Sequence, residues 1–162
     1  MALTRFQVTP TVTVPGTAYV QNDVVGGLLT FTGLRGGKLR GITLADKAAQ
    51  ITAVYRLILF ESSPTSSIAD NVNADLNDAD LARIIFEWDI PNGASPLPID
   101  KGQFSGITSF NDNAYFWTYG MDYPLWSAGG TVYGFLVLTT TSVPTFASTT
   151  DLTISLLVEM GG

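Results

Sequence analysis

Apolar and polar residues alternate in short runs along this chain, and glycine, proline, asparagine and aspartate separate the runs. In the first run, Phe6, Val8, Val12 and Val14 alternate with glutamine and threonine. A period of two places successive side chains on opposite faces and predicts a half-buried strand. Pro10 lies inside this run. Because proline cannot donate to a sheet ladder, the run is predicted to be an edge strand or an extended arm.

Similar signals recur to the end of the chain and predict a protein built almost entirely of strands. The further runs of this kind are 24–32, 41–45, 50–60, 84–90, one interrupted region made of 106–110 and 114–119, 131–140 and 152–160. Run 50–60 is apolar on both faces, which predicts a central strand. The pair Gly26-Gly27 predicts a bulge or a close backbone approach. Residues 75–83 form the one predicted helical turn, with Asn77 or Asp78 as its N-cap.

About eight strands with almost no helix predict an all-β fold. The 162 residues show no internal repeat and no linker, which indicates a single domain. We expect an antiparallel β-sandwich, jelly-roll-like, with one short helical turn; an immunoglobulin-like sandwich is the alternative. Residues 1–15 are predicted to be an N-terminal arm or edge strand, and residues 16–162 the β-sandwich domain.

The composition narrows the function classes. Hydrophobic residues make up 46% of the chain and charged residues only 14%, which fits either a surface covered by other subunits or an ordinary threonine-rich β-protein. Cysteine and histidine are absent, which removes disulfides, nucleophile–histidine pairs and thiolate or imidazole metal sites. We therefore predict no enzymatic activity and no cofactor. The sequence also predicts neither a signal peptide nor a membrane segment.

Charge is distributed unevenly along the chain. Residues 1–50 hold five basic and two acidic residues, whereas residues 51–162 hold three basic and twelve acidic ones. Arg35, Lys38 and Arg40 are grouped around Gly36-Gly37 and are predicted to project from a turn. Because no aromatic residues lie between these basic residues, the group is not typical of a surface that binds nucleic acid. It is either a solvated loop or a contact for an acidic protein surface.

Two carboxylate clusters are candidates for metal binding or catalysis. Residues 70–80 are rich in aspartate and asparagine and could ligate calcium, but they depart from the EF-hand pattern, with Asp75 at its sixth position and Leu81 at its twelfth. A surface loop leading into a helix is the alternative. Glu87 and Asp89 share a face of their predicted strand. A glycosidase-type hydrolase needs two neighbouring carboxylates of this kind, although no motif singles out this pair.

The segment 110–126 is the most aromatic part of the chain. Its candidate partner-contacting residues are Tyr115, Trp117, Tyr119, Tyr123 and Trp126. Aromatic side chains of this kind serve as core, as anchors of protein interfaces or as platforms for sugars. The N-terminal candidates for an interface are Val8, Pro10 and Val12.

The chain resembles the capsid decoration, or cement, proteins of tailed bacteriophages. The residues that carry the resemblance are the N-terminal Val/Thr arm, Asp23–Phe31, Tyr55–Thr65 with its Asp/Asn loop, and Pro144–Leu152, which leads into the last apolar run. The resemblance implies a jelly-roll-like sandwich on the outer capsid surface, where it stabilises the shell by bridging major capsid subunits. It further implies dimers or trimers, assembly in the host cytoplasm and no catalytic residues. A carbohydrate-binding module of a tail, head fibre or host-surface binder is the alternative.

Overall fold

The computed structural model describes residues 2–13, 17–47, 53–91, 114–127 and 129–160. Its elements are β1 (Leu3–Val8), β2 (Val24–Thr32), β3 (Gly37–Asp46), β4 (Val54–Phe60), α1 (Asp78–Leu81), β5 (Ile84–Pro91), β6 (Ala114–Leu125), β7 (Thr131–Leu138) and β8 (Leu152–Met160). The all-β prediction is confirmed. The predicted strand 106–110 lies outside the described residues. No helix in the described ranges is long and apolar enough to cross a membrane.

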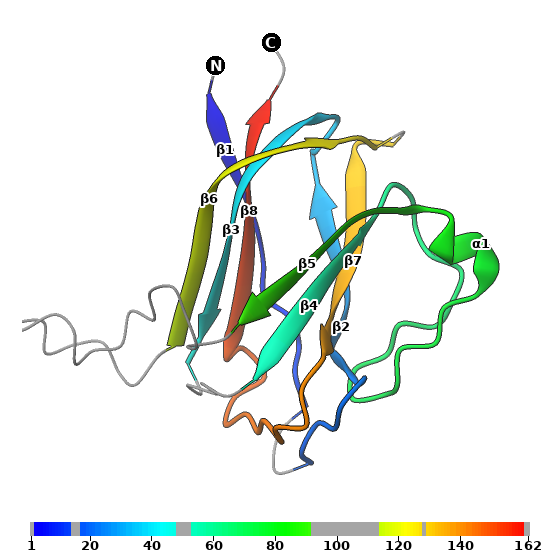
Figure 1. Cartoon of the computed structure of the whole chain (residues 1–162), viewed down its shortest axis with the longest axis vertical. Coiled ribbons are helices and arrows are strands. Elements are labelled where there is room, and N and C mark those ends of the chain that lie inside the picture. The colour runs from blue at the N-terminus through cyan, green and yellow to red at the C-terminus, as the bar shows by residue number, and fades with distance from the viewer. Residues whose placement is uncertain (1, 14–16, 48–52, 92–113, 128, 161–162) are drawn as a thin grey trace, which may run out of the picture.

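The eight strands form two four-stranded sheets, with the orders β1-β8-β3-β6 and β2-β7-β4-β5 (Figure 1). Strand β1 pairs with β8, β2 with β7, β3 with β6 and β4 with β5, and all four pairs are antiparallel. This is the pairing of one long hairpin folded over on itself, which defines a jelly roll and differs from the immunoglobulin order. The edge strands β1 and β2 lie beside each other on one side of the sandwich, and β5 and β6 on the other.

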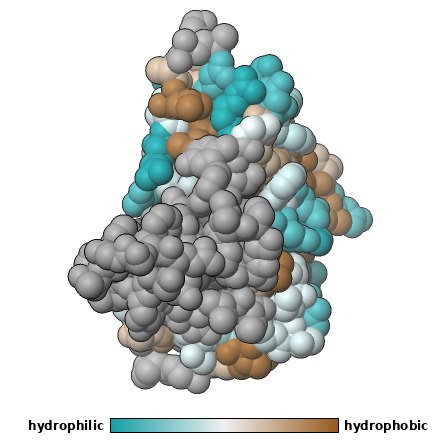
Figure 2. Space-filling model, turned by 60° about the vertical axis from the view of Figure 1, so that its left-hand side comes forward, coloured by the Kyte–Doolittle hydropathy of each residue, from teal (hydrophilic) through white to brown (hydrophobic). Residues whose placement is uncertain are grey.

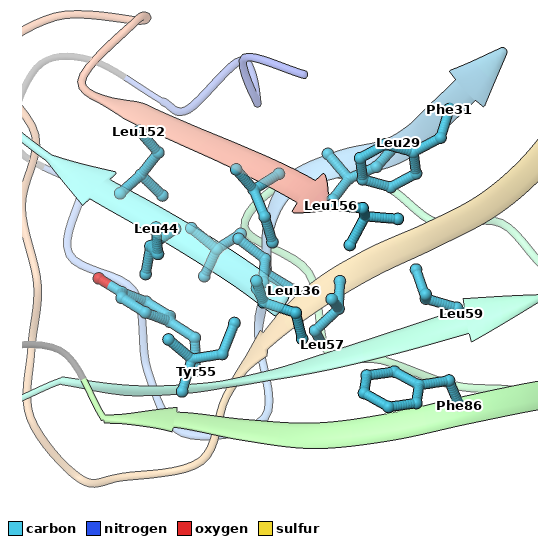
Figure 3. Close-up of a cluster of buried hydrophobic side chains, with 14 of the residues drawn as sticks. Leu29, Phe31, Leu44, Tyr55, Leu57, Leu59, Phe86, Leu136, Leu152 and Leu156 are labelled. Carbon is cyan, nitrogen blue, oxygen red and sulfur yellow. The ribbon is translucent and has the colours of Figure 1, made fainter. Parts of the chain in front are cut away.

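The core lies between the two sheets. Alternate residues of the strands point inward, among them Leu44, Tyr55, Leu57, Leu136 and Leu156 (Figure 3). Strand β4 lies between β5 and β7, which confirms the prediction of a central strand from its two apolar faces.

A second, smaller apolar cluster lies on the outer face of the sheet β2-β7-β4-β5. Its buried members are Val24, Phe60, Phe135 and Val137, and loop residues Ile68, Ala74 and Leu76 pack on it. The loop that leads to α1 therefore covers this face, which explains why β4 and β7 carry apolar residues on both sides. Asn77 caps α1 by accepting a hydrogen bond from the backbone N–H of Asp80, as predicted.

The glycine pair in β2 forms a bulge, as predicted. The register of β2 against β7 shifts between Val25 and Leu29, and Gly26 has a φ of 84°. A Cβ atom placed on Gly26 would lie 2.2 Å from Cβ of Pro10, so the backbone also approaches Pro10 closely. Only glycine readily combines a positive φ with so close an approach of another backbone segment.

Candidate functional site

Residues of β5 and β6 line an aromatic groove on the side of the sandwich where these two strands lie beside each other. It has a volume of about 400 Å³ and is lined by Phe86, Glu87, Trp88, Gly120, Met121, Asp122 and Tyr123. The rings of Phe86 and Trp88 lie parallel, with centroids 6.2 Å apart and planes 6° apart. Tyr123 meets Phe86 edge-on, with centroids 5.0 Å apart. Trp88 is 42% exposed and Tyr123 41% exposed, so these two aromatic side chains are open to solvent.

A bulge in β6 shapes one wall of the groove. Leu39 of β3 pairs with Tyr123 and Gly41 pairs with Tyr119, so residues 120–122 stand opposite Arg40 alone. Gly120 begins the bulge with a φ of 77°, a left-handed conformation that glycine adopts readily. Bulges of this kind re-aim side chains next to functional sites.

The carboxylates that line the groove already have basic partners within the chain. Asp122 lies 3.1 Å from Nζ of Lys38 and 2.9 Å from Nη1 of Arg40, and Glu87 lies 2.7 Å from Nη1 of Arg56. The hydrogen bond from Lys38, together with the charges of Lys38 and Arg40, lowers the pKa of Asp122 against the opposing effect of desolvation. The groove is therefore polar at its rim but carries little uncompensated charge.

Two of the three predicted basic contact residues lie in a strand. Lys38 and Arg40 belong to β3, whereas the glycine pair predicted that they would project from a turn; their ion pairs across the sheet favour the strand. Arg40 joins β3 to both neighbours, because it also lies 2.5 Å from Glu159 of β8. Arg35 is exposed in the loop between β2 and β3, and its side chain lies against Gly130.

The predicted aromatic residues all lie on or next to β6. Tyr123 lines the groove, and Trp126 follows the strand with 59% of its surface exposed. Tyr115, Trp117 and Tyr119 belong to β6, but their side chains lie outside the described part of the structure.

Sequence reasoning missed Phe86 and Trp88, because these residues lie on another strand, about 30 positions earlier in the chain. The only local signal was an aromatic residue between the acids Glu87 and Asp89. Trp88 belongs to the groove only through the close approach of β5 and β6.

The predicted N-terminal contact residues differ in exposure. Val8 ends β1, where it is half-buried and packs against the core. Pro10 is buried against Gly26, and Val12 is buried in the core, with its N–H donating to the carbonyl of Thr149. Pro10 and Val12 thus present no surface to a partner in this conformation.

The carboxylates of the acidic loop bind groups of their own chain. Asp70 accepts hydrogen bonds from the hydroxyls of Thr13 and Tyr19 and from the N–H of Gly26. Asp80 is buried and accepts from Thr65 and Ser66. No group of three or more potential metal ligands is present in the described ranges of the chain. The arrangement favours the interpretation of 70–80 as a loop leading into a helix.

The pair Glu87 and Asp89 lies on the outer face of β5, where both side chains make ion pairs with Arg56. Shared pairing with one guanidinium is typical of surface carboxylates on a strand and gives neither residue a distinct acid or base role.

No protein-family model matches the chain, and no curated protein matches it in sequence. Fold and surface chemistry therefore carry the functional argument.

Proposed function

We propose that the protein is a structural virion subunit that binds the outer surface of a bacteriophage capsid and stabilises the shell by bridging major capsid subunits. The observation that carries the proposal is the open edge strand β1. The jelly roll is a fold of viral capsid and lectin domains, and the 14% content of charged residues suits a surface that meets other proteins.

The edge strands β1 and β2, which lie on the same side of the sandwich, differ in how their outer edges are covered. The start of β2 is paired with the loop before α1, since Val24 donates to Val72 and Asn71 donates to Val24, both at 2.8 Å. Within the described residues, β1 pairs only with β8. Its outer edge therefore offers a row of backbone N–H and C=O groups to another strand.

The side chains of β1 do little to protect this edge. Natural proteins usually block open edges with proline or several charges, whereas β1 contains no proline and only Arg5 as a charged residue. Leu3 at its start is 62% exposed. Exposed apolar side chains of this kind are scattered over the surface among polar ones (Figure 2). A strand of a capsid subunit would add to β1 by backbone pairing, whereas β1 of a second copy added at the same edge would give a two-fold dimer.

The test measures binding of the purified chain to capsids from a phage that lacks this gene. We expect saturable binding in co-sedimentation and a higher temperature of shell disruption. The substitution Leu3→Lys should weaken binding about tenfold, because a charge at an open edge opposes strand addition. Failure of the parent chain to bind, or equal binding by the variant, contradicts the proposal.

The Leu3→Lys variant should keep the fold of the subunit. Position 3 is paired with Glu159 across β1 and β8, so the new lysine gains an acidic neighbour on its own face. Leu81→Lys is the matched control, since Leu81 is also half-exposed but lies on α1, away from β1 (Figure 1). The control should bind capsids as the parent does.

A further inference from the structure

The aromatic groove is an open site large enough for one small ligand. Its volume of about 400 Å³ lies within the range of ligand pockets, and its walls come from two different strands, β5 and β6. Trp88 stacks on the ring of Phe86, which is buried, so the aromatic surface open to a ligand is that of Trp88 and Tyr123. A flat ring could lie on this surface with its C–H groups against the negative π face.

The charges around the groove favour a neutral ligand. Because Glu87 is paired with Arg56, and Asp122 with Lys38 and Arg40, a free cation would gain little net attraction. The carboxylates of Glu87 and Asp122, which line the groove, remain good partners for hydroxyls, since a carboxylate oxygen accepts hydrogen bonds. A ring that carries hydroxyls on its edge and C–H groups on its face satisfies both surfaces of the groove.

We propose that this groove is a carbohydrate-binding site, which takes one neutral pyranose ring of a glycan on the aromatic surface of Trp88 and Tyr123. The site is independent of capsid binding through β1, because β1 and β6 are opposite edges of the same sheet. A subunit attached through β1 would therefore keep the groove open. The groove adds a sugar-binding activity to the proposed structural role.

The test uses the full chain and the methyl glycosides of glucose, galactose, mannose, N-acetylglucosamine and N-acetylgalactosamine, together with their oligosaccharides. Saturation-transfer NMR and calorimetry should detect binding of at least one sugar. Trp88→Ala and Tyr123→Ala should each weaken it about tenfold, and Trp88→Phe should retain part of it. Trp126→Ala is the matched control, because Trp126 is exposed but does not line the groove; it should bind as the parent does.

Two results would overturn the proposal. These are no binding by any glycoside or oligosaccharide, and sugar binding that Trp88→Ala leaves unchanged. If no sugar binds and Trp88→Ala instead loses capsid binding, the groove is an anchor for protein. Leu3→Lys separates the two proposals, since it should weaken capsid binding while sugar binding stays as in the parent. Far-UV circular dichroism of each variant checks that the fold is intact.

Discussion

Buried aspartates organise the loops of this molecule. The carboxylate of Asp80 accepts from the N–H of Thr65 at 2.9 Å and from the N–H of Ser66 at 2.6 Å, which fastens the loop after β4 to α1. Burial alone would raise the pKa of Asp80, but the hydrogen bonds from Ser66 and Thr65 outweigh it and lower the pKa to about 2. Since these bonds favour the ionised form, the loop should loosen in acid.

The pH dependence of stability tests this role. The pKa of Asp80 is lower in the folded protein than its ordinary 3.8, so the unfolded chain binds more protons between the two values. This contribution is therefore complete above pH about 4 and is lost as the pH falls towards about 2. Asp80→Asn should lower the melting temperature at pH 7 and flatten its change between pH 4 and 2, whereas Asp78→Asn on the exposed face of α1 serves as the control. A parent-like acid profile in Asp80→Asn would contradict the assignment.

Gly26 is a second position where one residue supports a long-range contact. Gly26→Ala combines a φ of 84° with a clash against Pro10, so we expect a loss of about 2 kcal/mol in the free energy of unfolding. Urea denaturation measures it. Gly129→Ala is the control, because a Cβ atom there would meet nothing within 4 Å. Equal midpoints for the two variants would show that the packing of Pro10 on β2 contributes little.

Local sequence predicted those strands whose signals are local. The bounds of β2 and β8 agree with the predicted runs 24–32 and 152–160, because each run is apolar and is bounded by turn residues. β1 starts at Leu3 and ends at Val8, before Pro10, although the alternation of apolar residues continues to Val14. The alternation with a period of two therefore predicted the presence of β1, and Pro10 marks where the strand ends.

The parts that sequence missed depend on pairing between distant residues. β3 begins at Gly37 rather than Gly41, since Lys38 and Arg40 find acidic partners on β6 and β8. β6 continues to Leu125 beyond Gly120, because an edge strand tolerates a bulge. These two extensions create the groove and its rim, so its position could not be derived from local patterns.

At the scale of the whole molecule, part of the charge asymmetry of the sequence is offset by contacts among the described residues. Asp80 and Asp151 are buried, and each accepts hydrogen bonds from backbone N–H groups of nearby loops. Glu159 is paired with Arg40, and Asp89 with Arg56. The excess of acidic residues in 51–162 therefore leaves a weaker acidic surface than the sequence predicts, and its basic counterpart is reduced in the same way.

The basic residues should consequently divide into those that stabilise the fold and those that affect only association with a partner. Arg40 bonds to both Asp122 and Glu159, so Arg40→Ser should lower the free energy of unfolding by about 1 kcal/mol, equivalent to about 2–4 °C in melting temperature.

Arg35 is exposed in a loop, so Arg35→Ser should leave the melting temperature unchanged. Its charge would act on the encounter with an acidic partner, and its loss should slow association with capsids at low salt and reduce the salt dependence of the rate. Thermal melting and stopped-flow association at two salt concentrations measure both effects. Unchanged melting in Arg40→Ser would remove the structural role, and unchanged association kinetics in Arg35→Ser would mean that the loop is only solvated.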